Sequence, residues 1–355
     1  MRKKQQDNSN SPFRITTSCY YFAQPTAVKV FFFAVLLFSG SLTGLAQQQP
    51  QFSHNMFNNM GINPAYAGLQ NSICFTVLAR HQWLGFKTPT SNTDSNSQNP
   101  TSGLYDNLNP VTYQLSVDAT VPFVRGGIGL TILQDQLGYE KNFGVGLAYS
   151  YHLKLGSNRL GLGAQVSFLD RRFDFSSLNP LVSGDPALSG GSEKSRMFVD
   201  FAAGAFFQGK DIWVGVSGSQ LRQATNAITD PQIKLNRHLY FAGGFIAALP
   251  NNPSITLSPS VLFKTDMNTL QADINALATY NKRIWGGVSY RLQDAIVFLV
   301  GMNIEQLSFG YSYDFTLTQI GRRGRSFGSH EVMIQYRFNL HLDKIRRIQR
   351  NVRFL

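Results

Sequence analysis

Val111-Thr-Tyr-Gln-Leu-Ser-Val-Asp-Ala-Thr120 alternates apolar and polar side chains without interruption. A β-strand places successive side chains on opposite faces, so this period of two predicts a strand with one apolar face and one polar face. Leu307-Ser-Phe-Gly-Tyr-Ser-Tyr-Asp-Phe315 repeats the pattern, and the stretch from Val332 to Phe338 does so again. About fourteen such segments lie between residues 71 and 339, which predicts an all-β chain.

The composition suits strands that have one face in lipid. Charged residues make up 15% of the 355-residue chain, where about a quarter is usual for a soluble protein. Gly (31), Phe (28) and Tyr (14) are abundant instead, while hydrophobic residues reach only 43%. This combination disfavours a helical membrane protein, a coiled coil and a disordered chain. Two cysteines, Cys19 and Cys74, are too few for a disulfide framework or a cysteine-based metal site.

The links between the predicted strands indicate how the sheet closes. Long links fall at 84–110, 175–195, 221–236 and 318–328, whereas tight turns such as Gly156-Ser-Asn158 and Gly209-Lys210 end the intervening strands. A transmembrane β-barrel has short periplasmic turns and longer outer loops, and lipid forbids an open sheet edge. We therefore expect an antiparallel transmembrane barrel of about fourteen strands over residues 71–339. An exported sandwich or propeller also alternates, but sandwich strands run about five or six residues, shorter than these.

The N-terminus predicts export. Basic residues at positions 2–4 precede a short apolar run, Val30-Phe-Phe-Phe-Ala-Val-Leu-Leu-Phe38, and small residues follow at Gly44 and Ala46. A membrane-spanning helix needs about 20 apolar residues, so the run is too short to anchor the chain. We expect residues 1–46 to be a signal peptide. Export makes nucleic acid an unexpected partner, although the formal net charge is +12.

Several blocks resemble one family. Phe57-Asn-Asn-Met-Gly-Ile-Asn-Pro-Ala-Tyr-Ala-Gly68 looks like its N-terminal signature, and Arg80-His-Gln-Trp-Leu-Gly-Phe86 fits an Arg-x-Gln-Trp-x-Gly-Phe pattern. Gly310-Tyr-Ser-Tyr-Asp-Phe315, a Gly-rich loop and Gly328-Ser-His-Glu-Val332 match its closing hairpin. Together these blocks resemble the PorP/SprF membrane proteins of the type IX secretion system, over essentially all of residues 52–339.

The resemblance implies an outer-membrane barrel that is not a general porin. Members are needed for secretion or surface display of proteins that carry the system's C-terminal sorting domain, gliding adhesins among them. The implied partners are that secreted protein, the periplasmic lipoprotein ring and a peptidoglycan-binding component, together with outer-membrane lipid. The alternative is a passive outer-membrane channel for small or hydrophobic solutes, because the barrel fold does not decide between the two.

The family signature predicts a segment that enters the barrel. Proline at position 64 fixes the backbone and restricts Asn63 to extended conformations, and Ala65-Tyr66-Ala67-Gly68 offers one large ring among small neighbours. We expect residues 47–70 to form a periplasmic, plug-like segment in the periplasmic mouth, with Asn63, Pro64, Ala65, Tyr66 and Gly68 as its motif. The alternative is an ordered tail on the rim.

The first predicted strand has its own candidate residues. By parity Arg80 and Gln82 share the polar face, so both should point into the lumen, with Asp118 on the next strand as a candidate partner of Arg80. Structural ion pairing is the expected role of Arg80, with solute selectivity as the alternative. Trp83 is expected to anchor the outer membrane interface, and Gly85 completes the motif.

The outer links and the C-terminal tail are candidate contact surfaces. Arg322, Arg323 and Arg325 lie among glycines in the last link and are candidate contacts for a partner outside the cell. Residues 340–355 form a basic periplasmic tail, read either as a short amphipathic helix or as a disordered basic segment.

No catalytic constellation emerges from the sequence. Gly126-Gly-Ile-Gly129 and similar runs do not lie between a strand and a helix, as a dinucleotide loop requires, and are read as small residues on crowded strands. The histidines have no ligand spacing. We expect no enzyme activity, no cofactor and no metal.

Overall fold

The computed structural model describes residues 49–85, 109–174, 194–226, 233–318 and 326–339. Short helical turns are η1 (Asn55–Phe57), α2 (Asn59–Ile62), η2 (Pro64–Tyr66) and η3 (Pro122–Val124). The strands are β1 (Ser72–His81), β2 (Val111–Val121), β3 (Gly126–Leu137), β4 (Glu140–Leu155), β5 (Asn158–Phe173), β6 (Lys194–Gln208), β7 (Ile212–Ser219), β8 (Thr225–Asn226), β9 (Ile233–Lys234), β10 (His238–Phe245), β11 (Ala247–Leu249), β12 (Asn252–Thr265), β13 (Leu270–Tyr280), β14 (Ile284–Arg291), β15 (Ala295–Ile304), β16 (Leu307–Thr316) and β17 (Ser329–Asn339).

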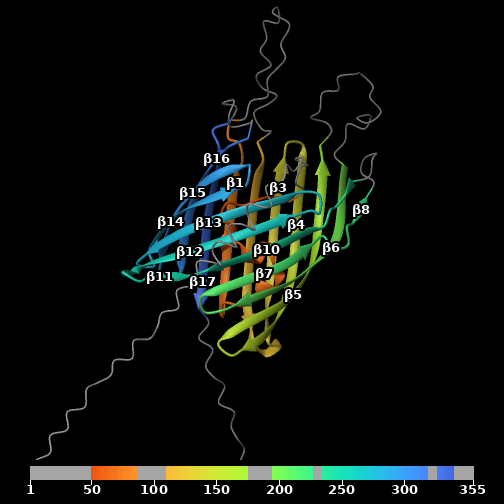
Figure 1. The fold of residues 1–355 in the computed structure, drawn as a ribbon. Helices are drawn as coiled ribbons and strands as arrows, with labels where there is room; N and C mark the ends of the chain where they lie inside the picture. Colours follow the sequence, from red (N-terminus) through yellow and green to blue (C-terminus); the bar gives the residue numbers. More distant parts are fainter. Residues whose placement is uncertain (1–48, 86–108, 175–193, 227–232, 319–325, 340–355) are drawn as a thin grey trace, which may run out of the picture. The chain divides into compact units, whose positions relative to one another are not determined.

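The large sheet closes on itself. Each long strand pairs antiparallel with its neighbours, β1 pairs with both β2 and β17, and β10 pairs with both β7 and β12. β11 continues β10 beyond Ile246 along the same partner, β12. The wall is therefore a closed antiparallel barrel of 14 strands, which confirms the predicted fold class (Figure 1). Inside the predicted link 221–236, β8 and β9 form a small separate hairpin.

The two faces of the wall are inverted relative to a soluble protein. On β2, Thr112, Gln114 and Ser116 are buried, while Tyr113 on the other face is exposed. On β17, Val332, Ile334, Tyr336 and Phe338 are all exposed, and the alternate residues Glu331, Met333 and Gln335 are buried. Apolar side chains that face outward around a closed barrel are what a lipid environment selects. The alternation seen in the sequence thus sorts lipid-facing from inward residues.

The two rims differ as the link lengths predict. The described strand ends that border the gaps 86–108, 175–193, 227–232 and 319–325 lie at the upper rim in Figure 1. The turn after β4, the turn after β6 and η3 lie at the opposite rim (Figure 1). The upper rim is called the outer rim below, because long loops of such barrels face outward.

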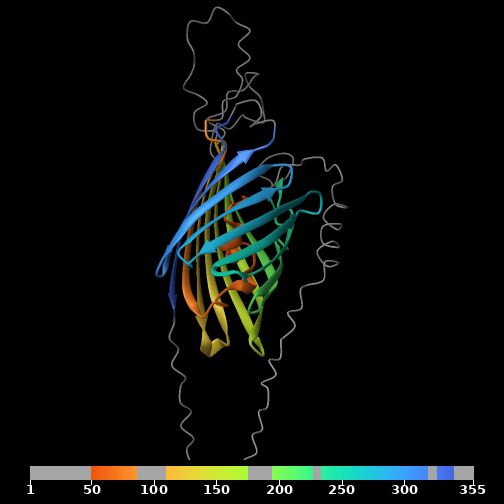
Figure 2. The same ribbon diagram turned by 60° about the vertical axis from the view of Figure 1, so that its left-hand side comes forward.

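Residues 49–71 precede β1 and run inside the barrel; we call them the inner segment. Figure 2 shows its orange ribbon between the walls. Near its start, Ser53 and His54 contact the outer ends of β16 and β17, and near its end Gly68 contacts the periplasmic end of β2. The sequence predicts this segment in the periplasmic mouth. In the structure its first half lies deeper in the barrel, level with Arg80 near the outer rim.

Candidate functional site

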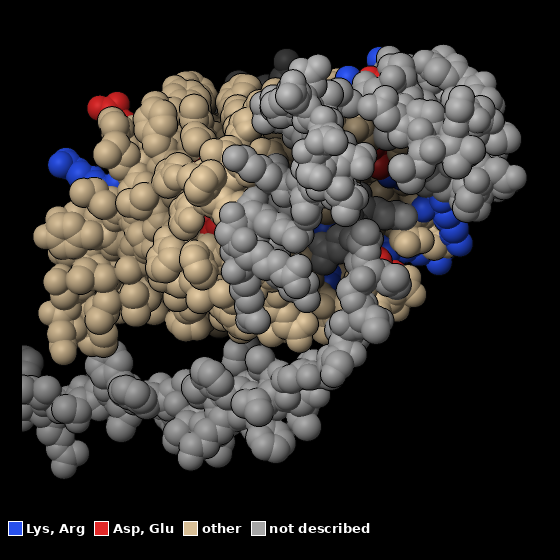
Figure 3. Space-filling model, turned by 90° about the horizontal axis from the view of Figure 1, so that it is seen from above, with Lys and Arg blue, Asp and Glu red and all other residues tan. Residues whose placement is uncertain are grey.

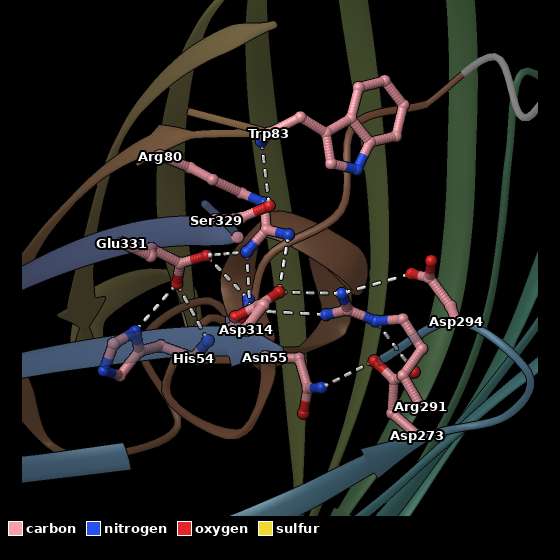
Figure 4. A network of polar contacts seen from close by, with 12 residues as sticks. His54, Asn55, Arg80, Trp83, Asp273, Arg291, Asp294, Asp314, Ser329 and Glu331 are labelled. Atoms are coloured by element: carbon pink, nitrogen blue, oxygen red, sulfur yellow. Dashed lines mark hydrogen bonds and ion pairs between the residues drawn. The ribbon is translucent and has the colours of Figure 1, made fainter. Parts of the chain in front are cut away.

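The inward faces of β1, β14, β16 and β17 bring opposite charges together near the outer rim. Arg80 donates to Asp314 at 2.7 Å and to Glu331 at 3.2 Å. Arg291 reaches the same Asp314 carboxylate at 3.0 Å, and Asp273 of β13 lies 3.4 Å from its Nε. Figure 4 shows these side chains converging from separate strands. We call Arg80, Asp273, Arg291, Asp314 and Glu331 the ion cluster; each has a relative exposure of 2% or less.

The ion cluster holds the start of the inner segment. The Ser53 hydroxyl donates to Asp314 at 2.7 Å, and its backbone N–H donates to Glu331, also at 2.7 Å. The backbone N–H of His54 donates to the other Glu331 oxygen at 2.9 Å, and the His54 ring lies 2.8 Å from it (Figure 4). The Asn55 amide donates to Asp273 at 3.0 Å. Carboxylates that accept backbone N–H groups of one segment fix its position as well as its charge environment.

An apolar cluster lies below these ion pairs. Phe52 packs with Leu78, Val297 and Met333, and the Phe57 ring lies 4.8 Å from that of Trp285. Three of these side chains, Leu78, Val297 and Met333, are inward residues of strands and are fully buried. The inner segment thus gives this side of the barrel a hydrophobic core of its own.

The end of the inner segment is held by the opposite side of the wall. The Asn63 amide donates to the carbonyl of Ala205 at 3.0 Å and to that of Val216 at 3.2 Å, while its oxygen accepts from Ala65 N at 3.0 Å. Asn63 therefore caps η2 and ties it to β6 and β7 at once. The Tyr66 ring packs edge-on against Phe206 at 5.1 Å.

Glycines on the wall make room for this part of the backbone. A Cβ at Gly161 or Gly163 on β5 would collide with the backbone of Ala65, and one at Gly127 would collide with that of Ala67. Gly68 has φ +68° and its N–H donates to Asp118 at 3.0 Å. The sequence predicts only small residues on crowded strands at these positions, and the structure shows that the inner segment is what crowds Gly127, Gly161 and Gly163.

A cavity of about 200 Å³ remains beside the inner segment. Its lining comes from the inner segment and the walls, and it mixes apolar residues such as Phe52 and Leu262 with polar ones, among them Asn58, Gln114, Asn142, Gln165, Arg171 and Lys264. The Lys264 ammonium donates to Gln49 O at 3.0 Å, and Arg171 pairs with Glu140. A hollow of this size with polar side chains in its wall has room for water molecules.

The chain matches a known family. The model for the type IX secretion system membrane protein PorP/SprF matches residues 44–336. The chain belongs to this family. No curated protein matches it.

Solved structures with a similar arrangement are other barrels. The toluene transporter TbuX of Ralstonia pickettii is 13% identical with a TM-score of 0.48, over 80% of this chain and 93% of that one. The monoaromatic hydrocarbon channel CymD is 10% identical with a TM-score of 0.43, over 85% of this chain and 95% of that one. Omp33 of Acinetobacter baumannii is 7% identical with a TM-score of 0.39, over 76% of this chain and 99% of that one.

Membership in the PorP/SprF family and the inverted faces give the location. A membrane protein whose closed barrel turns its apolar side chains outward resides in the outer membrane. Within the described residues, no helix is both long enough and apolar enough to cross a membrane.

The PorP/SprF blocks fall on the two anchors of the inner segment. Asn63, Pro64, Ala65, Tyr66 and Gly68 all lie in its second half, in contact with β2 to β7. Asp314 and Glu331, in the two closing blocks, both accept hydrogen bonds from Ser53. Parity within those blocks indicates that both acids point inward, and this is the signal in the sequence that could have found them.

The strand-one residues have different environments. Arg80 points into the lumen, as predicted. The predicted pairing of Arg80 with Asp118 is wrong, because Arg80 pairs with Asp314 and Glu331. In the register Arg80 is opposite Thr112 and Glu331, while Asp118 is opposite Cys74. Cys74 precedes Arg80 by six residues, which separates Asp118 from Arg80 by about 20 Å along the strand. Asp118 holds Gly68 instead.

Beyond β1 the chain contacts the start of β2 and then the start of β17. Gln82 N donates to Pro110 O at 2.8 Å, and Trp83, with φ +49°, donates its N–H to Ser329 Oγ at 3.1 Å. Gly85 has φ +71°, and a Cβ there would meet the Phe327 ring. Trp83 as an interface anchor stays a prediction. Arg322, Arg323, Arg325, the signal peptide and the tail 340–355 lie outside the described residues.

Proposed function

We propose that this PorP/SprF-family barrel is needed for secretion or surface attachment of proteins that carry the C-terminal sorting domain of the type IX system. The observation that supports this role is the inner segment, which is held at Ser53–Asn55 by the ion cluster and at Asn63–Gly68 by β2 to β7. A lumen crossed by a segment held at both ends is better suited to a scaffold than to a pore. The outer loops then provide the contact surface.

We further propose a task for each part of the chain. Residues 1–46 direct export, residues 47–70 act as a plug, and the barrel 71–339 presents the outer links, including Arg322, Arg323 and Arg325, to the secreted protein. The basic tail 340–355 faces the periplasm, where the lipoprotein ring and the peptidoglycan-binding component are the candidate partners. In this role the protein has no enzymatic activity and no cofactor.

Deletion of the gene tests the role. We expect the cognate secreted protein to be absent from the cell surface while other outer-membrane proteins assemble normally. Shortening link 84–110 or neutralising the three arginines should reproduce part of that defect without lowering the amount of barrel. Normal surface display in the deletion strain, together with altered uptake of small solutes, would instead support the channel.

A passive channel is the second candidate, and the cavity beside the inner segment favours it. Conductance in planar bilayers separates the two. The intact barrel should conduct little, and a variant that lacks residues 49–70 should conduct more, if the segment closes the lumen. Equal conductance in both would remove the basis for the plug.

A further inference from the structure

The outer part of β6 is paired on one edge only. Its ladder with β5 runs the full length, from Lys194 opposite Phe173 to Gln208 opposite Arg159. Its ladder with β7 covers only Ala203–Gln208. Residues 195–202 therefore have no ladder on the edge that faces away from β5. In a closed barrel such an edge is an exception, and natural sheets usually protect edges from added strands.

Part of this edge is capped by side chains. After β7 the chain makes one more backbone hydrogen bond to β6, from Leu221 N to Phe201 O at 3.0 Å. The Asp200 carboxylate then takes the place of backbone pairing, because it accepts from Phe201 N at 2.7 Å and from Arg222 N at 2.9 Å. The Arg222 guanidinium reaches Val199 O at 3.4 Å. Alternate residues of a strand point their backbone groups to the same edge, so Met197 and Ser195 come next. The described residues give the backbone of these two no partner on that side.

The open part begins at the outer border of the lipid-facing band, because Phe143 of that band is opposite Asp170 in the register and Asp170 is opposite Met197. Phe143 on β4 and Phe168 on β5 are the last exposed aromatic residues of this sector toward the outer rim. Met197 is opposite Asp170, which is paired with the exposed Arg172. Charges that face outward do not lie in hydrocarbon, so the open edge runs from the membrane interface into water. Met197 itself is 67% exposed.

Basic side chains surround the open edge. Arg196, Arg222 and Arg237 are exposed in this sector. Figure 3 looks down on the outer rim and shows blue side chains gathered at its right, on the side where Figure 1 draws β6 and β8. An unpaired strand edge can bind an extended backbone as an added strand. The basic side chains around this edge favour a segment with negative charge.

We propose that the outer edge of β6 at Ser195–Val199 accepts an extended acidic segment of a surface protein as an added strand. That this protein is the secreted substrate rests on the proposed function. Backbone hydrogen bonds to Met197 and Ser195 give affinity, and Arg196, Arg222 and Arg237 favour glutamate or aspartate on the added strand.

A peptide-binding measurement tests the edge with the full-length barrel in detergent micelles. The probe is a fluorescent octapeptide of alternating valine and glutamate. Met197→Pro removes the N–H at the open edge, where an edge strand tolerates proline, whereas Met197→Ala keeps it. We expect Met197→Pro to weaken binding about tenfold and Met197→Ala to change it less than about twofold. Heat-dependent gel mobility checks that each variant is a folded barrel.

Two further probes separate the edge from a simple charge patch. A backbone N-methylated version of the peptide and a valine–lysine version should each bind about tenfold more weakly. If the N-methylated peptide binds as tightly as the original peptide, backbone pairing is not involved and the proposal is overturned. If micelles of a phosphate-bearing glycolipid displace the valine–glutamate peptide, the patch is a lipid headgroup site, and the proposal is overturned as well. Equal binding by Met197→Pro would also overturn it.

Surface display in cells separates this proposal from the proposed function. If the deletion strain displays its secreted protein normally while Met197→Pro still loses the peptide, the proposed function fails and the docking edge stands. If display is lost in the deletion strain but is normal with Met197→Pro, the docking edge fails and the proposed function stands.

Discussion

At the scale of single residues, Arg80 determines whether the buried charges balance. Its side chain is 3% exposed and pairs with Asp314, which is 1% exposed. Arg80→Met would leave Asp314 and Glu331 with one counter-charge fewer, and breaking a buried pair in this way costs about 3–5 kcal/mol. The control is Arg172→Met, because Arg172 also pairs with an aspartate at 2.7 Å but is 51% exposed, where such pairs contribute about 0–1 kcal/mol. Urea unfolding in micelles measures how much stability each variant loses relative to the unchanged protein. Equal unfolding midpoints for the two variants would contradict a buried ion cluster.

Parity in the sequence predicts the orientation of Arg80 but not its partners. Strand alternation alone places Arg80 and Asp118 on inward faces, and both are buried. Which of them meet depends on register, which sets Arg80 level with Glu331 and Asp118 level with Cys74. Ser53 and His54 gave no signal of their own, because their role depends on carboxylates that lie more than two hundred residues along the chain.

At the scale of elements, the inner segment and the glycines of β5 are matched to each other. Gly163→Ala would place a Cβ against the Ala65 backbone and displace η2, whereas at Gly144, also inward, the nearest atom to a Cβ is Leu169 Cδ1 at 3.5 Å. We expect chymotrypsin to cut at Phe57 or Tyr66 faster in Gly163→Ala than in Gly144→Ala, with both barrels folded. If the two variants resist equally, the segment does not depend on this contact.

The strands were predictable as elements, and the path of the inner segment was not. Period-two patterning fixes the strands because the lipid and inward faces select different side chains, as Tyr313 and Asp314 on β16 show. The inner segment has no such period: Asn63-Pro64 indicates a turn, but contacts with β16 and β17 set its height. Likewise the open edge of β6 follows from unequal ladders, which alternation does not specify.

At the scale of the whole molecule, the outward band must lie in lipid, and one strand can test its depth. Val300 and Ile304 of β15 both point outward and are 55% and 54% exposed, but Val300 lies at mid-strand and Ile304 at the rim. An arginine at the bilayer midplane costs about 2–4 kcal/mol and one near the interface about 0–1 kcal/mol. In vesicles, Val300→Arg should therefore destabilise the barrel by about 2 kcal/mol or more beyond Ile304→Arg. In water both substitutions would be surface changes of similar, small effect. Equal unfolding midpoints for the two variants would mean that the band is solvated, and the membrane topology would then have to be abandoned.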